Sequence, residues 1–508
     1  MGLILNGNVS VEKYEKMETP TLQQLSYLMT HSVDSSLSKR SIVFRKFKAG
    51  ILLLFSDILL ICFSLFISLL IRDLLWPGDV NHAKYLPLVP FLLSLFPVAF
   101  YLRGLYPGFG IDVIEELKNL TYSITIVFAF LATMSFLVKD AWEYSRLAFL
   151  TSWLISLILV PLGRSLVKKI FSSKEWWGVP VIIIGAGKAG ENVINSLRKH
   201  QQIGLRPIVA VDDDIDRWGY INKIPVIGGL DTIPRLKEQF NIDNAIFAMP
   251  NVSRKRQQEI VEKYQKYFSN ITIIADLYGL SSLWVSTKDI GGILGLEFKQ
   301  SLLKRSSIIR KRIFDIVFSI IFGIITLPIC LFIAIVIKLD SKGKVFFRQK
   351  RMGINHTIFE IIKYRTMHID AERRLKELLV NNEEFRNEYE VYHKLRDDPR
   401  LTKFGKILRK FSLDELPQFW NVIKGEMSLI GPRAYIPAER PEMQGKDEII
   451  LKVKPGISGL WQVTDRNQSS FEERLNTDIY YIRNWSMFLD IYILARTIGV
   501  VLLGKGAY

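Results

Sequence analysis

The sequence predicts a membrane protein in three parts: a four-helix transmembrane bundle, a Rossmann-like α/β domain, and a second α/β domain with a reentrant membrane helix. Three observations carry this prediction. Four long apolar runs lie within residues 46–170, a strand, glycine turn and helix follow at 179–193, and a fifth apolar run at 313–337 has basic residues on both sides. With 508 residues, the chain is long enough for two or three domains.

The four apolar runs cover residues 49–71, 85–102, 119–138 and 147–163, and Asp57 is the one charged residue in them. Each is long enough, or nearly so, to cross a hydrocarbon core of about 30 Å as a helix. Basic residues precede the first run and follow the fourth, among them Arg45, Lys46, Arg164 and Lys168. Because such residues stay on the cytoplasmic side, we expect residues 1–45 to be a cytoplasmic segment, 46–170 to be the bundle, and the inner membrane to be the location. Asp57 is expected near the headgroups or paired with a basic residue.

The formal net charge of +17 fits a lipid bilayer as partner better than nucleic acid. No motif that reads DNA or RNA accompanies the charge. The two cysteines, Cys62 and Cys330, both lie inside apolar runs, so neither a disulfide framework nor a cysteine metal cluster is expected.

Residues 175–298 are predicted to form the Rossmann-like domain. Strands are expected within 179–193, 206–214, 244–250 and 270–276, with helices between them. Gly185, Gly187 and Gly190 fit the G-x-G-x-x-G pattern, and Asp212 follows where a ribose-binding acid would lie. Two hypotheses stay open: the loop binds a nucleotide, or its glycines serve only the tight turn and the domain acts in dimerisation or regulation.

Residues 302–508 form the last predicted domain, which begins with a reentrant helix over 311–338. A spanning helix should have basic residues mainly at one end, whereas this run has them at both. Proline breaks or kinks a helix, so we expect the chain to bend at Leu327 and Pro328 and return to the same face. A fifth membrane span is the alternative. A hairpin is expected around residues 344–367, a charged helix over 370–395, and an interfacial apolar segment over 486–504.

The stretch FSLDELPQFW, residues 411–420, places Asp414 and Glu415 behind a run of positive charge. Residues 394–410 contain seven Lys or Arg and two acids. Ser412 and Glu415 fit a capping box, which predicts a helix start here. A carboxylate is also able to attack a phosphoryl group when a divalent cation and nearby Lys or Arg neutralise the anions. Both interpretations are compatible.

The C-terminal part, from about Ile308 to Tyr508, resembles the bacterial sugar transferase family, the monotopic phosphoglycosyl transferases. The motifs that carry the resemblance are KRIFD (311–315), VFFRQ (345–349), IKYRTM (362–367), the long segment 401–433, KPGISGLWQV (454–463) and YYIRNWS (480–486). The whole order, four spans, a CoA-binding-like domain and a transferase, is similar to the large members of this family.

This resemblance implies transfer of hexose-1-phosphate from a UDP-sugar to undecaprenyl phosphate with release of UMP, in O-antigen, capsule or exopolysaccharide synthesis. Galactose is the favoured sugar and glucose the alternative. The family motif implies that Asp414 is the nucleophile that forms an aspartyl phosphosugar, and that Glu415 is its partner with Mg2+ at the pair. Phosphate contacts are implied for Arg409, Lys363, Arg365, Arg433 and Arg466. Ala434 and Asp465 depart from residues common in the family, proline and glycine respectively.

Two other functions are compatible with parts of the sequence. A membrane-anchored nucleotide-sugar dehydratase also combines four spans with a Rossmann-like domain, but it needs a Y-x-x-x-K pair and a second glycine motif, and this sequence has neither. A scaffold or regulator of polysaccharide assembly is the other alternative, against which the intact Asp414 and Glu415 argue. A homodimer formed through the Rossmann-like domain is a further expectation.

Overall fold

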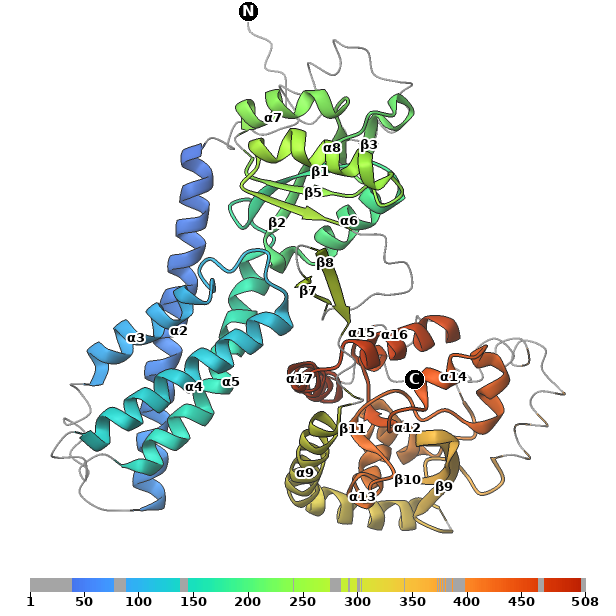
Figure 1. Ribbon diagram of the computed structural model, residues 1–508. Coiled ribbons are helices and arrows are strands. Elements are labelled where there is room, and N and C mark those ends of the chain that lie inside the picture. The colour runs from blue at the N-terminus through green and yellow to red at the C-terminus, as the bar shows by residue number, and fades with distance from the viewer. Residues whose placement is uncertain are drawn as a thin grey trace, which may run out of the picture. The chain divides into compact units, whose positions relative to one another are not determined.

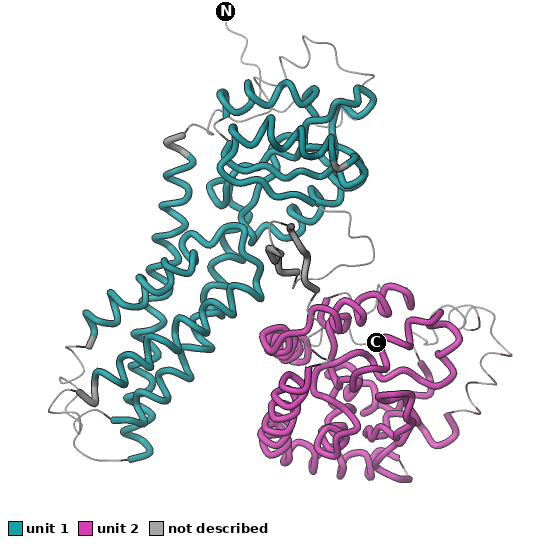
Figure 2. Tube along the Cα trace, viewed as in Figure 1, with its two compact units in different colours: residues 1–277 teal, residues 278–508 magenta. Residues whose placement is uncertain are grey.

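The computed structural model describes residues 39–76, 88–137, 145–240, 242–274, 285–290, 293–298, 302, 304–341, 343–371, 398–464 and 470–503, with single positions between 373 and 386. Residues 1–38, most of the predicted helix 370–395, and both Asp465 and Arg466 lie outside the described residues. Two compact units divide the chain between residues 277 and 278 (Figure 2), whereas the sequence places the end of the first α/β domain at 298.

The N-terminal unit begins with four apolar helices: α2 (Lys39–Leu75), α3 (Leu88–Leu102), α4 (Val113–Leu137) and α5 (Arg146–Phe171) (Figure 1). Among the described residues, four helices are long and apolar enough to cross a membrane, and these are α2, α4, α5 and α9 (Arg305–Asp340). Helix α3 has 15 residues, a length of about 22 Å, and is shorter than the predicted run 85–102. Residues 77–87 before it lie outside the described residues.

A network of charged side chains is buried inside this bundle. The guanidinium of Arg164 pairs with Asp57 at 2.7 Å and with Glu116 at 3.1 Å, and Lys168 Nζ lies 2.7 Å from the second oxygen of Glu116. The hydroxyl of Tyr106 donates to Asp57. Asp57 therefore pairs with a basic residue, which confirms one of the two alternatives expected for it. Arg164 and Lys168, counted in the sequence as cytoplasmic flank, instead belong to a buried ion-pair network.

A six-stranded sheet follows, in the order β3-β4-β2-β1-β5-β6, with its strands at Gly219–Ile221, Ile224–Val226, Leu205–Val211, Val179–Ile184, Asn244–Phe247 and Asn270–Ile273. All its pairings are parallel except that of β3 with β4. Strands β1, β2, β5 and β6 confirm the four predicted strands. Each is a short apolar run that the sheet buries, which is the pattern of parallel strands.

Helices cover both faces of this sheet. Alternate residues of β1 point to opposite faces. Ile182 and Ile184 join a core with α7 (Ile233–Phe240) and α8 (Arg254–Tyr264), and Val181 and Ile183 join a second core with α6 (Lys188–Lys199). The glycine turn between β1 and α6 therefore lies at the carboxyl edge of the sheet.

The C-terminal unit contains the predicted hairpin, β9 (Phe346–Met352) with β10 (Ile358–Tyr364), which pair antiparallel with Lys363 opposite Phe347. A second hairpin joins β7 (Val285–Ile290) to β8 (Ile293–Phe298). The remaining elements are α12 (Lys403–Lys410), α13 (Phe419–Lys424), β11 (Ser428–Ile430), α14 (Asp447–Ile450), β12 (Gly456–Ser458), α15 (Leu460–Thr464), α16 (Phe471–Arg483) and α17 (Met487–Leu503).

Helix α9 is continuous but bent, with its olive and yellow parts running in different directions in Figure 1. Its first arm is tied to the domain by Asp315, which accepts from Ser428 Oγ at 2.8 Å and Leu429 N at 3.1 Å. Its second arm packs Ile333 and Ile337 into a core of the same unit.

A straight helix of 36 residues would be about 54 Å long, which would carry the two arms far apart. Pro328 lies inside the helix, where it removes one backbone donor and favours a kink. The side chains between the two arms are apolar and exposed, including Ile324 and Leu327.

Candidate active site

Asp414 and Glu415 lie on a 3₁₀ helix, η11 (Leu413–Gln418), directly after α12. Helix α12 begins at a true cap, where Gly405 N donates to Thr402 Oγ1 at 2.9 Å. It ends at Phe411, and Ser412 then adopts a left-handed conformation with φ of 52° that turns the chain. The acids are thus presented by a tight turn.

The predicted capping box at Ser412 is wrong. An N-cap residue has an extended backbone, whereas Ser412 is left-handed and its side chain makes no cap hydrogen bond. The Glu415 amide bonds to the backbone oxygen of Ser412 at 3.3 Å. The Glu415 carboxylate bonds instead to Lys363.

Asp414 is the buried member of the pair, with only 8% of its surface exposed. Burial and the neighbouring charge of Glu415 raise the pKa of its carboxyl to about 6, against the opposing charges of Lys363 and Arg409. At neutral pH the side chain is therefore mostly ionised and little solvated. Such a carboxylate is a competent nucleophile toward a phosphorus atom that cations hold nearby.

Lys363 reaches the acids from strand β10, with its Nζ 2.6 Å from Oε1 of Glu415. Asn421 fixes this strand against α13, because its Oδ1 accepts from Ile362 N at 3.1 Å and its Nδ2 donates to Glu360 O at 2.7 Å. Asn421 is completely buried. The position of Lys363 is therefore set by the domain core.

Arg409, in the last turn of α12, donates from Nε to Thr366 Oγ1 at 3.2 Å. Burial lowers the pKa of its guanidinium, and the charge of Asp414 opposes this. Glycine at position 405 permits the close approach of α12, because a Cβ there would lie 2.0 Å from the backbone oxygen of Thr366. The structure therefore brings together Asp414, Glu415, Lys363 and Arg409.

The other predicted phosphate contacts are placed differently. The guanidinium of Arg365 donates to the backbone oxygen and the hydroxyl of Ser341, each at 2.8 Å, just past the end of α9. Arg433 belongs to a second group of cations. The guanidinium of Arg433 lies over the indole ring of Trp461, with 5.7 Å between the guanidinium carbon and the ring centre.

Two further arginines were missed in the sequence. Arg474 also lies over Trp461, at 5.4 Å, and Arg351 donates from Nη1 to the backbone oxygen of Ala434 at 2.9 Å. Burial and the charge of Arg433 lower the pKa of Arg351 to about 10, while the charge of Glu415 opposes this decrease. Arg351 therefore lies within electrostatic range of the acidic pair. For Arg351, the available sequence signal was its position in the predicted hairpin. It lies four residues after Phe347, which pairs with Lys363, and so points to the same face.

Comparison with known proteins places these residues in a family. The sequence model described as "Bacterial sugar transferase" matches residues 306–504, and the one described as "CoA-binding domain" matches 103–275. The UDP-galactose-lipid carrier transferase of Erwinia amylovora is 33% identical over 406 residues, 77% of this chain and 82% of the relative. The chain belongs to the bacterial sugar transferase family.

Other relatives of this sugar transferase cover similar shares. The undecaprenyl-phosphate galactose phosphotransferase of Salmonella typhimurium is 33% identical over 82% of this chain and 88% of the relative. The UDP-glucose:undecaprenyl-phosphate glucose-1-phosphate transferase of Klebsiella pneumoniae is 27% identical over 89% of this chain and 95% of the relative. The similarity includes the membrane bundle as well as the C-terminal domain.

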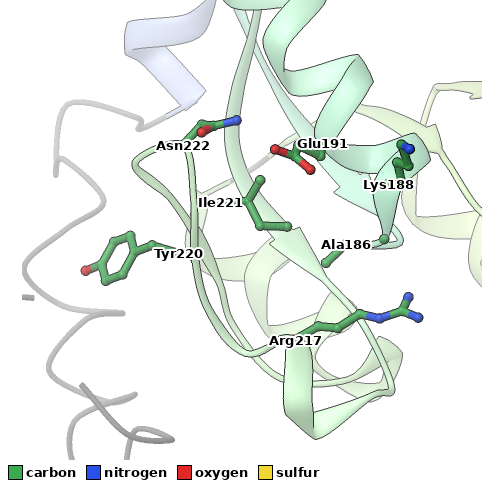
Figure 3. A pocket seen from close by; sticks show the side chains of 8 residues that line it. Ala186, Lys188, Glu191, Arg217, Tyr220, Ile221 and Asn222 are labelled. Carbon is green, nitrogen blue, oxygen red and sulfur yellow. The ribbon is translucent and has the colours of Figure 1, made fainter. Parts of the chain in front are cut away.

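The glycine loop of the sugar transferase borders a separate cavity of about 440 Å³ (Figure 3). It is lined by Ala186, Gly187, Lys188, Glu191, Arg217, Tyr220, Ile221 and Asn222. Gly185 has a φ of 105°, and a Cβ on Gly190 would lie 2.0 Å from the Gly185 oxygen. Gly185 and Gly190 are thus required by the turn and the close helix contact alone.

Asp212 faces its own loop in this structure. Its Oδ2 accepts from Ala186 N at 2.7 Å and from Arg217 Nη1 at 3.2 Å, and the residue is 4% exposed. Arg217 also pairs with Asp214 at 3.0 Å. The predicted ribose-binding carboxylate is therefore occupied by protein donors.

Proposed function

We propose that this sugar transferase moves hexose-1-phosphate from a UDP-sugar to undecaprenyl phosphate and releases UMP. The observation that carries the proposal is the buried carboxylate of Asp414 between a second acid and two cations, Lys363 and Arg409. The names of relatives that share most of their length with this chain supply the substrates. Galactose is favoured by two relatives at 33% identity, and glucose is the alternative from one at 27%.

The proposed chemistry has two displacements at one phosphorus. The Asp414 carboxylate attacks the β-phosphorus of the UDP-sugar, the bond to the bridging oxygen breaks, and the electron pair leaves with UMP. A phosphate oxygen of the lipid then attacks the same phosphorus, and Asp414 leaves as a carboxylate. Lys363 and Arg409 neutralise the phosphoryl oxygens, which would otherwise repel the nucleophile.

We propose Mg2+ as the cofactor. Among the described residues there is no group of three or more His, Cys, Asp or Glu that would form a metal site from protein alone. Asp414 and Glu415 supply two adjacent carboxylates, which fits Mg2+, since this ion is commonly held by one or two carboxylates with substrate phosphates and water completing its shell. Bound there, Mg2+ would neutralise the diphosphate and stabilise charge on the leaving oxygen.

We further propose that α9 is reentrant and that both soluble domains face the cytoplasm at the bacterial inner membrane. The bend of α9, the two anchored arms and the basic residues at both ends support this topology. A cytoplasmic site gives the chain access to nucleotide sugars and to lipid phosphates of the inner leaflet. The bundle then anchors the protein as a multi-pass membrane protein.

We also propose that the N-terminal sheet is a Rossmann-like domain, which its parallel order and the glycine turn support. Nucleotide binding at this loop stays a prediction, and the engagement of Asp212 by Ala186 and Arg217 argues against a ribose contact at that carboxylate. Dimerisation through this domain also stays a prediction, which a sedimentation profile in mild detergent would test.

The deciding experiment is UMP release from the purified membrane protein with undecaprenyl phosphate, Mg2+ and a panel of UDP-sugars. We expect release with one sugar, loss of release on chelation, and loss in Asp414→Asn. Glu442→Gln, which changes an exposed acid of the same domain, is the matched control and should remain active. The absence of UMP release with every UDP-sugar would contradict the proposed donor class.

A further inference from the structure

Three arginines far apart in the sequence converge in one region of the C-terminal unit, and the charge of Glu415 acts on one of them, Arg351. Arg433 and Arg474 lie over the same Trp461 indole, at 5.7 and 5.4 Å. Arg351 donates to the backbone oxygen of Ala434, the residue after Arg433. Elements as distant as β9 and α16 therefore direct guanidinium groups to one region.

The hairpin register places this region on the side of the acids. Residues opposite one another in an antiparallel pair share a face, and so do residues two apart on one strand. Lys363 pairs with Phe347, and Arg351 lies four residues beyond Phe347 on β9. Arg351 and Lys363 are therefore on the same face, and Lys363 bonds to Glu415.

Two acids, Glu439 and Asp478, lie beside Arg433. Glu439 Oε1 lies 3.6 Å from Arg433 Nη2, while its other oxygen accepts from Ile436 N at 2.7 Å. Asp478 is completely buried and accepts from Arg433 N and the Tyr435 hydroxyl. Burial raises the pKa of Asp478 to about 7, so this acid carries less than its full charge at neutral pH.

Arg351 also retains a buried donor. Its Nη1 and Nη2 are bonded to Ala434 O and Gln349 Oε1, but its Nε has no hydrogen-bond partner among the residues that the structure describes. The residue is only 9% exposed. A buried guanidinium donor without an acceptor among the described residues, next to the charge of Arg433, is suited to an anionic ligand.

We propose that Arg351, Arg433 and Arg474 form one anion subsite that holds the nucleotide-side phosphate of the donor and afterwards the phosphate of the lipid acceptor. This proposal rests on the proposed function and deepens it. Sequence motifs indicated Arg433 alone, and the structure adds Arg351 and Arg474. The subsite is distinct from Lys363 and Arg409, which flank the phosphorus that is attacked.

One subsite serves two ligands because both displacements occur at the same phosphorus. In-line attack by Asp414 expels UMP on the side opposite the carboxylate. When the lipid phosphate later displaces Asp414 in line, it attacks from the side that UMP left. The leaving phosphate and the incoming phosphate therefore occupy the same position in turn, and the same cations neutralise both.

Each half of the reaction has its own assay. Exchange of radiolabelled UMP into the UDP-sugar without lipid reports the first displacement in the full-length protein. The KM for undecaprenyl phosphate, measured by UMP release, reports on the acceptor. We expect Arg351→Gln and Arg474→Gln to slow exchange about 10- to 100-fold and to raise the acceptor KM by about 10-fold or more.

Two controls distinguish binding from folding. Arg348→Gln changes an exposed arginine on the opposite face of β9 and should match the wild type in both assays. Thermal unfolding midpoints are compared for all variants. Arg474 is only half-buried, so its substitution should disturb folding less than that of Arg351. If Arg351→Gln does not fold, Arg474→Gln alone tests the proposed subsite.

The outcomes separate the two proposals. Folded variants with a wild-type exchange rate, or with slow exchange and an unchanged acceptor KM, would overturn the shared subsite and leave the proposed function intact. If the wild-type protein exchanges labelled UMP into none of the UDP-sugars in the panel, the proposed function is overturned, and the proposed subsite with it.

Discussion

Lys363 Nζ lies 2.6 Å from Oε1 of Glu415, and it arrives from a hairpin strand about fifty residues before the acids. The lysine thus neutralises the more exposed acid while its charge lowers the pKa of the buried one, Asp414. Burial and Glu415 act in the opposite direction. The ionisation of Asp414 is therefore a balance that single substitutions should shift in known directions.

We expect the rate of UMP exchange to fall as the pH decreases through about 6, since only the ionised Asp414 attacks phosphorus. Lys363→Met removes a charge that lowers this pKa, so the acidic limb of the pH profile should move to higher pH. Glu415→Gln removes a charge that raises the pKa, so the limb should move to lower pH, at a reduced maximal rate. Exchange rates across the pH range measure both shifts.

Opposite shifts in these two variants are the decisive result. A limb that stays in place in both would show that another group controls the profile. Arg348→Gln, on the outer face of the hairpin, is the matched control for loss of charge at Lys363.

We expect Asp414→Asn to be inactive but more stable than the wild type. The folded protein binds the Asp414 proton more tightly than an unfolded chain does, because the pKa is about 6 rather than 3.8. Ionisation therefore costs stability. The cost is absent below about pH 4, grows between about pH 4 and 6, and reaches at most about 3 kcal/mol above pH 6.

The thermal unfolding midpoint at about pH 7.5 and about pH 4 checks this prediction. The asparagine variant should unfold at a higher temperature than the wild type at the higher pH, and at a similar temperature at the lower pH. Asp340→Asn, which changes an exposed acid at the end of α9, should show no gain. A midpoint below that of wild type at the higher pH would contradict the prediction.

A reentrant α9 places both of its ends on the cytoplasmic side. In a background with Cys62→Ser and Cys330→Ser, we expect Ser306→Cys and Lys344→Cys to react with an impermeant thiol reagent only after the membrane is opened. Trp76→Cys, at the far end of α2, should react from outside in intact cells and serves as the positive control. Reaction of Lys344→Cys in intact cells would instead establish that α9 spans the membrane.

Arg164→Met should destabilise the membrane bundle strongly. The change leaves Asp57 and Glu116 buried without their shared cation, and breaking a buried ion pair typically costs about 3 to 5 kcal/mol. The expected result is a lower thermal midpoint and a lower yield of folded protein. Lys169→Met alters an exposed cation of the same helix and should have little effect, so equal midpoints for the two variants would refute the network's role.

Local patterns in the sequence predicted much of the fold. The parallel strands are short apolar runs, the β9–β10 hairpin alternates around a turn, and Pro328 marked the helix that bends. The ion pairs of Arg164 were not predictable, because counting charges near a helix end does not reveal that Asp57 and Glu116 face it from other helices.

In the candidate site, too, residues close together in the sequence were predictable, and contacts between distant elements were not. Asp414 and Glu415 are adjacent in one motif, and in the structure Lys363 bonds to Glu415 and the charge of Arg409 acts on Asp414. Arg351 contacts Ala434, 83 residues later in the chain, and Arg474 contacts Trp461 on a neighbouring helix, and such contacts between separate elements have no local pattern. Ser412 matched the capping motif by residue type, but its left-handed backbone is imposed by the turn between α12 and η11.

Leu413 and Leu416, which flank the acidic pair, pack against the cluster of Ile333 and Ile337 on the second arm of α9. The turn that carries Asp414 and Glu415 is therefore packed against the helix that we propose to be reentrant. With that helix in a membrane, lateral pressure and bilayer thickness would act on its second arm, and the two leucines would pass a displacement on to the proposed nucleophile. Under the proposed topology, the physical state of the surrounding lipid becomes a variable of catalysis, alongside substrate concentration and pH.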